Sequence, residues 1–137
     1  MINKMYVAQA LKLQAKTATD ALSVTLIGGD KGYQPTPTQT LVIESPLFGD
    51  DEAIGVGDDS SDLQTGIYQL DVLTPKVNGN KWQALNLATQ INQYFTRGTE
   101  LTKSGQKVRI KNTNTSSLIQ DDTHFRYALS ITFTVIN

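Results

Sequence analysis

The clearest pattern of apolar and polar positions lies at the end of the chain. Over residues 123–135 a large apolar side chain stands at every second position, with polar or small side chains between them. This two-residue period predicts a β-strand with one buried face, because a shift of one residue would turn six large apolar groups toward solvent. The apolar positions are Phe125, Tyr127, Leu129, Ile131, Phe133 and Val135.

Two other segments repeat their apolar residues with the period of a helix. The first predicted helix begins near Asn3 and ends before the glycine pair at 28–29. The second is predicted over residues 81–96, because Asn80 can cap its start and Gly98 suits the position after its last turn. The predicted buried stripes are Ala8, Leu11, Ala15, Ala18 and Leu22 in the first helix, and Ala84, Leu85, Ala88, Ile91 and Phe95 in the second.

Shorter strands fill the rest of the pattern. We predict strands over 40–45 and 65–74, and a hairpin over 101–112 that turns at residues 103–105. Pro46 confines the end of the first of these strands to a sheet edge or a kink. The order α-β-β-α-β-β-β then predicts a single α+β domain over residues 1–137. Its economical packing is a mainly antiparallel sheet of about four to five strands covered by two helices.

Residues 49–62 break the periodic pattern with acids and turn residues. The segment holds six acids, three glycines and two serines, and few of its side chains could offset the entropy of ordering. It is therefore predicted to be a flexible surface loop. Its spacing differs from that of a calcium-binding loop, so a solvated loop is favoured over a cation site. The acids are Asp50, Asp51, Glu52, Asp58, Asp59 and Asp62.

Composition narrows the classes of function. A chain of 137 residues can bury a core without covalent staples, and the lack of cysteine excludes disulfides and thiolate metal sites. Lys4, Lys12, Lys16 and Asp20 interrupt the apolar residues near the N-terminus. Neither a signal peptide nor a membrane span is therefore expected, and the chain is predicted to be made in the cytoplasm without a membrane partner.

The charges are distributed unevenly between the two halves of the chain. Residues 1–75 hold 4 basic and 10 acidic residues, whereas residues 76–137 hold 8 basic and 3 acidic residues. The basic stretch at 103–111 contains Lys103, Lys107, Arg109 and Lys111, the last three on one predicted strand face. Such a face fits an acidic protein patch, a nucleic-acid backbone or plain solvent. The pI of about 5.7 and the lack of interleaved aromatic residues argue against nucleic acid.

The sequence offers little for catalysis. His124 is the single histidine, and Ser130 lies six residues along the same predicted strand, about 20 Å away. His124 is therefore expected to be a surface residue at a strand end. The paired carboxylates lie in the predicted flexible loop, which lacks the rigid, desolvated setting of acid–base chemistry. We expect no catalytic residue, no metal site and no cofactor.

Two further residues are candidates for contact with another protein. Trp82 is at the second position of the predicted helix, beside the apolar stripe. It either covers the edge of the core or anchors an interface, and tryptophan is enriched in both settings. Arg97 is expected in the last helical turn, where a cation suits the helix dipole. Trp82 and Arg97 are therefore candidate interface residues, together with the acidic and basic residues named above.

Several segments together resemble a known family. GIYQLDV occupies residues 66–72, followed by Pro75 and by Gly79 ahead of the helix. YFTRGT occupies residues 94–99, and the basic VRI strand occupies residues 108–110. In this combination the chain resembles the tail terminator and tail-completion proteins of tailed phages. These motifs are signatures of a fold rather than of a catalytic site.

The resemblance spans residues 65–137 and, loosely, the N-terminal helix; it does not extend to the loop at 49–62. It implies an α+β subunit that forms a ring, typically of six copies, at the head-proximal end of a non-contractile tail. Such a ring would stop growth of the tail tube and offer a surface to the head connector. The implied partners are further copies of the chain, the tail tube protein and a connector or stopper protein, in the neck of the virion.

Two alternatives remain at this stage. Another neck component, such as a head–tail connector or stopper, would also form a ring. A small nucleic-acid-binding module would have to use the basic hairpin at 103–111, whereas a ring would only let the genome pass through it. A closed ring joins two different patches on neighbouring copies. We therefore expect the acids of the 50–62 loop to lie near the basic hairpin of a neighbour, or to face the tube.

Overall fold

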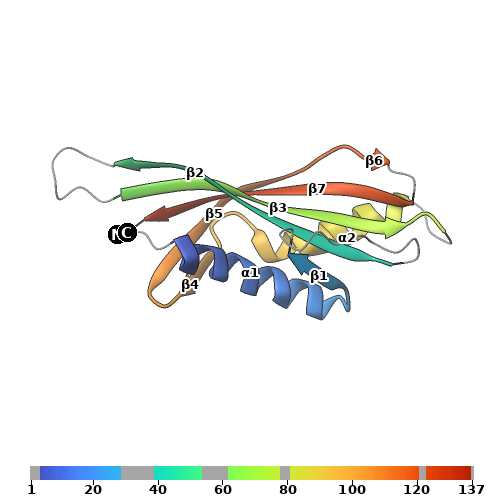
Figure 1. The fold of residues 1–137 in the computed structure, drawn as a ribbon, viewed down its shortest axis with the longest axis horizontal. Coiled ribbons are helices and arrows are strands. Elements are labelled where there is room, and N and C mark those ends of the chain that lie inside the picture. Colours follow the sequence, from blue (N-terminus) through green and yellow to red (C-terminus); the bar gives the residue numbers. More distant parts are fainter. Residues whose placement is uncertain (1–3, 29–38, 54–61, 78–80, 121–122, 137) are drawn as a thin grey trace.

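The computed structural model describes residues 4–28, 39–53, 62–77, 81–120 and 123–136 (Figure 1). Its helical elements are α1 (Lys4–Ala21), α2 (Lys81–Asn92) and the 3-10 turn η2 (Gln93–Phe95). Its strands are β1 (Thr25–Gly28), β2 (Leu41–Ala53), β3 (Asp62–Pro75), β4 (Glu100–Lys103), β5 (Gln106–Thr115), β6 (Ile119–Gln120) and β7 (His124–Ile136).

The strands form one curled sheet. Within the described ranges its order is β1-β2-β3-β7-β5-β4, with the two-residue β6 also paired to β7. Every neighbouring pair is antiparallel except β1 and β2. The predicted α+β class is confirmed, but the sheet has more strands than the predicted four to five. The added strands, β1 and β6, are too short to leave a clear period in the sequence.

Both helices lie on the same side of the sheet (Figure 1). α1 packs over β4 and β5, and α2 packs over β3 and β7. Beneath them, cross-strand pairs such as Leu70–Leu129 and Ile110–Phe133 are buried. Each fully buried side chain of this size contributes roughly 1.5–3 kcal/mol relative to an exposed one. The predicted alternation of β7 is confirmed for five of its six positions, since Tyr127, Leu129, Ile131, Phe133 and Val135 are buried, whereas Phe125 is only partly buried against the same core.

The helices differ from the predictions in detail. Val7 and Ala10 are buried in α1, whereas the predicted stripe residues Ala8 and Leu22 are partly exposed. α2 ends at Asn92 rather than Thr96, and the tighter η2 turn follows it. This turn places Phe95 in the core, with its ring centroid 6.3 Å from that of Tyr68. Arg97 is consequently beyond the helix, so the expected interaction with the helix dipole is not available.

The predicted end of the first long strand is wrong. β2 continues through Pro46 to Ala53 and pairs with β3 as far as Ala53–Asp62, with an irregular register between Phe48 and Asp51. β1 borders β2 only up to Glu44, so within the described residues Pro46 is on a sheet edge, where proline is tolerated. The segment predicted as a loop is therefore partly strand.

The basic hairpin is confirmed. β4 and β5 meet in a two-residue turn in which Ser104 has a φ of 51° and Gly105 a φ of 84°. Positive φ at both central residues gives the turn a twist that matches the strands on either side. Gly98 also has a positive φ, 89°, and its N–H donates to the carbonyl of Ile110 at 2.8 Å. No helix among the described residues is long and apolar enough to cross a membrane.

Candidate interaction surfaces

The face of the sheet that points away from α1 and α2 is rich in small and hydroxyl side chains. It follows from the register, because alternate residues of β3, β7 and β5 must point to this side. None of the helices in the described ranges lies over it (Figure 1). Its partly or fully exposed residues include Thr65, Ile67 and Gln69 of β3, Ser130, Thr132 and Thr134 of β7, and Lys107 and Arg109 of β5.

A groove of about 460 Å³ crosses this open face. One row of aligned residues forms its floor: Thr65 pairs with Thr134, which pairs with Arg109, which pairs with Glu100. The row therefore crosses β3, β7, β5 and β4. We call this feature the basic groove. Its described lining residues are Thr65, Glu100, Lys107, Val108, Arg109, Lys111 and Thr134.

Three cations and one acid line the basic groove. Lys107, Arg109 and Lys111 are exposed, whereas Val108 and Ile110 between them are buried, as the strand period predicts. Arg109 donates to Glu100 at 2.6 Å, and this contact holds the pKa of the Glu100 carboxyl below its usual range. Among the described residues neither Lys107 nor Lys111 has an ion-pair partner. Two lysine charges are thus available to a ligand.

Lys103 lies away from the basic groove. It pairs with Gln106 in the hairpin, and this pair shares its sheet face with Leu101 and Val108, toward α1. It lines a separate hollow of about 290 Å³ with residues of α1, namely Gln9, Lys12, Leu13 and Lys16. The sheet therefore divides the basic stretch of the sequence between its two faces.

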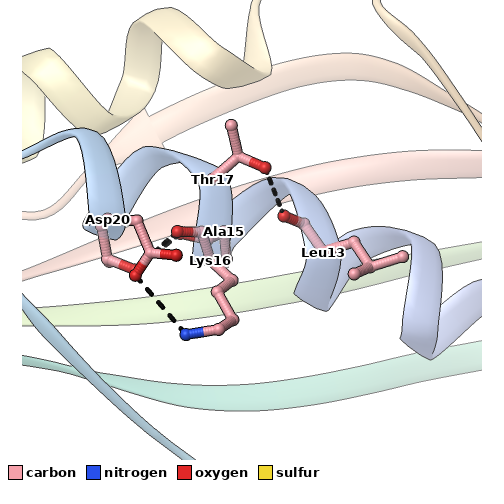
Figure 2. Close-up of polar contacts among 6 residues, drawn as sticks. Leu13, Ala15, Lys16, Thr17 and Asp20 are labelled. Carbon is pink, nitrogen blue, oxygen red and sulfur yellow. Dashed lines mark hydrogen bonds and ion pairs between the residues drawn. The ribbon is translucent and has the colours of Figure 1, made fainter.

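On the α1 side of this hollow, polar side chains make contacts with other residues of the same chain. Figure 2 shows Lys16 turned toward Asp20, with 3.4 Å between Nζ and the carboxylate oxygen, and Thr17 donating to the carbonyl of Leu13 at 2.9 Å. Lys12 lies 3.7 Å from the carboxylate of Glu44. Two of the lysines around this hollow are therefore already opposed by acids of the same chain.

The remaining basic and aromatic candidates have different settings. Arg97 is exposed in the turn after η2, and the bond from Gly98 to Ile110 brings this turn beside the part of β5 that carries Lys111. Trp82 of α2 is 63% exposed, so it does not serve mainly to cover the core. It is not among the residues that line the basic groove. Its role as an interface anchor stays a prediction.

The acidic candidates fall into three groups. Asp50, Asp51 and Glu52 belong to the outer half of β2, and Asp62 begins β3 opposite Ala53. We call these paired strand ends the acidic arm; they reach one end of the molecule's long axis, beyond α1 (Figure 1). Asp58 and Asp59 lie outside the described residues. The prediction of a flexible loop is therefore wrong for residues 50–53.

Two buried acids escaped the sequence analysis, and a buried histidine was placed wrongly by it. Glu44 is 6% exposed and accepts a hydrogen bond from the Tyr68 hydroxyl, whose pKa is raised by burial and by this carboxylate. Asp71 is 3% exposed and accepts from Gln69 at 2.9 Å and from Arg126. Glu44 follows the buried Val42 by two residues on an otherwise apolar strand face, which is the signal that could have found it, whereas Asp71 follows the polar Gln69 and gives no such signal.

His124 is the buried histidine, and the prediction of a surface histidine is wrong. Its side chain is 1% exposed, with Nε2 at 2.9 Å from the carbonyl oxygen of Gln39 and Nδ1 at 2.7 Å from Thr123 Oγ1. β7 pairs His124 with Pro75 of β3, which extends the sheet around it. Within the described ranges no three histidine or acidic side chains gather as metal ligands.

Comparisons with known proteins agree with the fold. A family model described as phage tail terminator protein matches residues 6–133. One solved structure superposes on this chain with a TM-score of 0.77 and a sequence identity of 13%. The superposition covers 98% of this chain and 96% of that chain. At that identity the likeness shows the fold alone. No curated protein matches the sequence.

The family match spans nearly the whole chain, including α1, both faces of the sheet and the basic hairpin. Proteins of this family are structural components of the virion tail that interact with the tail tube. The resemblance seen over residues 65–137, and loosely in the N-terminal helix, is thereby confirmed. This chain belongs to the phage tail terminator protein family.

Proposed function

We propose that this protein forms a ring that caps the tail tube, stops its polymerisation and provides the surface to which the head joins. The observation that carries the proposal, beyond family membership, is the separation of charge across one sheet. The basic groove lies over β5 and β4, and the acidic arm lies at the end of β2 and β3. A closed ring requires two different, complementary patches on each copy.

The ring geometry is compatible with capping. When every copy uses one lateral patch to bind the next, closure fixes the number of copies in the ring and leaves its two faces for contacts along the tail axis. The two faces of such a ring differ, so that one can bind the last tube ring and the other can meet the head. We propose six copies, which is the number that the resemblance to tail terminators implies.

The first test is the mass of the purified protein by light scattering over a wide concentration range, with negative-stain images of the same samples. We expect a ring-shaped particle of about six copies. The particle is then incubated separately with purified tail tubes and with tail-less heads. Binding to tube ends supports the terminator function, whereas binding to heads alone would identify another neck component such as a connector or stopper.

A further inference from the structure

We propose that the acidic arm of one copy binds in the basic groove of the next copy, and that this contact closes the ring. The inference rests on the proposed function and names the two surfaces that meet. It assigns the groove on the open sheet face to a second copy of this chain, rather than to a small ligand or to nucleic acid.

The register places the two surfaces at opposite edges of the same end of the sheet. One aligned row runs from Asp51 through Gln64, Val135 and Val108 to Leu101. The next row is the floor of the basic groove, from Thr65 to Glu100. The acids of β2 are thus level with Lys107 and Arg109 but three strand spacings away, which is about 14 Å.

This spacing favours a contact between copies over one within a copy. A separation of about 14 Å exceeds the Debye length of about 8 Å at physiological ionic strength, so attraction over this distance across the surface of one chain is largely screened. When two copies lie side by side, however, the acidic edge of one meets the basic edge of the other. The same contact repeats around the ring without using any surface twice.

The charges of the two surfaces are complementary. Residues 45–64 contain six acids and no lysine or arginine, so the segment that includes the arm is purely acidic in sequence. In the basic groove, Glu100 opposes Arg109, which leaves Lys107 and Lys111 to meet the incoming carboxylates. The carboxylates come from Asp50, Asp51 and Glu52, which are consecutive residues of the outer half of β2, where its register with β3 is irregular.

The acidic arm also has a free border to offer. β1 pairs with β2 only over Leu41–Glu44, so within the described residues nothing pairs with the outer side of β2 near Asp51. At the opposite edge of the sheet, β4 pairs with β5 only as far as Arg109 and therefore borders only part of the groove. The neighbour can therefore approach along the sheet edge and reach the groove from the open face.

The experiment is a charge swap measured by assembly. The variant K107E/K111E places two new carboxylates beside Glu100 where the arm should bind, and D51K/E52K places two lysines opposite two lysines. For each variant we expect the concentration for half-assembly of the ring to rise on the order of 100-fold, in line with the loss of close charge pairs at an interface. The combined variant K107E/K111E/D51K/E52K has the wild-type net charge and the reversed polarity. It should assemble again to within roughly tenfold of wild type.

The matched control is K16E/K76E, which changes the net charge as K107E/K111E does but on surfaces away from the groove. Lys16 is on α1 and Lys76 follows the far end of β3. This variant should assemble like wild type. Circular dichroism and thermal unfolding of every variant separate loss of assembly from loss of fold, and the combined variant shows that the altered positions tolerate both substitutions.

Each outcome decides between the claims. If wild type forms rings and K107E/K111E does so at the same concentration, the proposed contact is wrong while the ring remains. If the wild-type protein stays monomeric both in solution and on tubes, the proposed ring function is wrong and so is the proposed contact. If K107E/K111E assembles normally but loses salt-dependent binding to double-stranded DNA, the groove binds nucleic acid and the inference is overturned.

Discussion

At the scale of single residues, a buried hydrogen bond ties β2 to β3 beneath α1. The hydroxyl of Tyr68 donates to the carboxylate of Glu44, and both residues are buried. Lys12 of α1 lies 3.7 Å from the same carboxylate but is itself largely exposed. The tyrosine is therefore the main buried donor to this acid among the described residues.

Replacing Tyr68 with phenylalanine should leave the Glu44 carboxylate buried without that donor. We expect the free energy of unfolding to fall by about 1.5–3 kcal/mol, the range for hydrogen bonds to charged groups. Urea denaturation measures the difference. Tyr94→Phe is the control, because Tyr94 is only partly buried and its hydroxyl has no hydrogen-bond partner among the described residues. Equal stabilities for the two variants would contradict the account.

The ion pair of Glu100 and Arg109 predicts a pH effect. Arg109 lowers the pKa of Glu100, so the folded state favours the charged carboxylate more than the unfolded state does. Its stabilising contribution is present at neutral pH and is lost as the pH falls through the lowered value. In an NMR titration the Glu100 carboxyl should titrate below the usual value of about 4.3, and Arg109→Ala should raise its pKa. If the pKa of Glu100 is the same in the Arg109→Ala variant, the ion pair does not form in solution.

At the scale of elements, the turn of the basic hairpin positions the groove. Gly105 has a φ of 84° and an added Cβ would meet nothing within 4 Å, so the cost of Gly105→Ala is backbone strain alone. We expect a loss of about 1 kcal/mol, the lower end for a left-handed residue with a side chain. Ser104→Asn should be neutral or slightly stabilising, because asparagine tolerates its φ of 51° better. In thermal unfolding, the midpoint temperature should therefore fall for Gly105→Ala and stay the same or rise slightly for Ser104→Asn.

The sequence predicted elements well where the period was long. β7 and the two helices each repeat their pattern over a dozen residues or more, so local errors could not change their type. The predicted ends of β2 and α2 were wrong, because tertiary contacts decide where these two elements stop. Pro46 is tolerated because of its edge position, and the chain after Asn92 tightens so that Phe95 enters the core. The sequence predicted a sheet edge or a kink at Pro46, but it did not show that the strand continues beyond this residue or that Phe95 enters the core.

The candidate site was predictable only in part. Alternation along β5 correctly separated Lys107 and Arg109 from Val108 and Ile110. The sequence could not show that Lys103 faces α1, because this depends on the hairpin register. It also could not reveal the groove, whose floor joins residues of β3, β7, β5 and β4 that are far apart along the chain. Long-range strand pairing had to be known first.

At the scale of the whole molecule, the fold puts its helices on one side and leaves a polar sheet face on the other (Figure 1). An exposed sheet edge is an aggregation hazard unless it is charged, bulged or covered. Here one edge carries the acids of β2 next to a bulge, and the other is the short β4. These features prevent indiscriminate pairing and, in our account, direct each copy to one neighbour.

The most direct measurement of the central claim is the length of tail tubes grown in the presence of this protein. Purified tube protein is polymerised with and without the chain, and lengths are read from negative-stain images. We expect added protein to end growth, giving shorter tubes with a ring at one end, and K107E/K111E to have little effect. Tubes that grow to the same length with or without the wild-type protein, and carry no ring, would contradict the proposal that it terminates the tail.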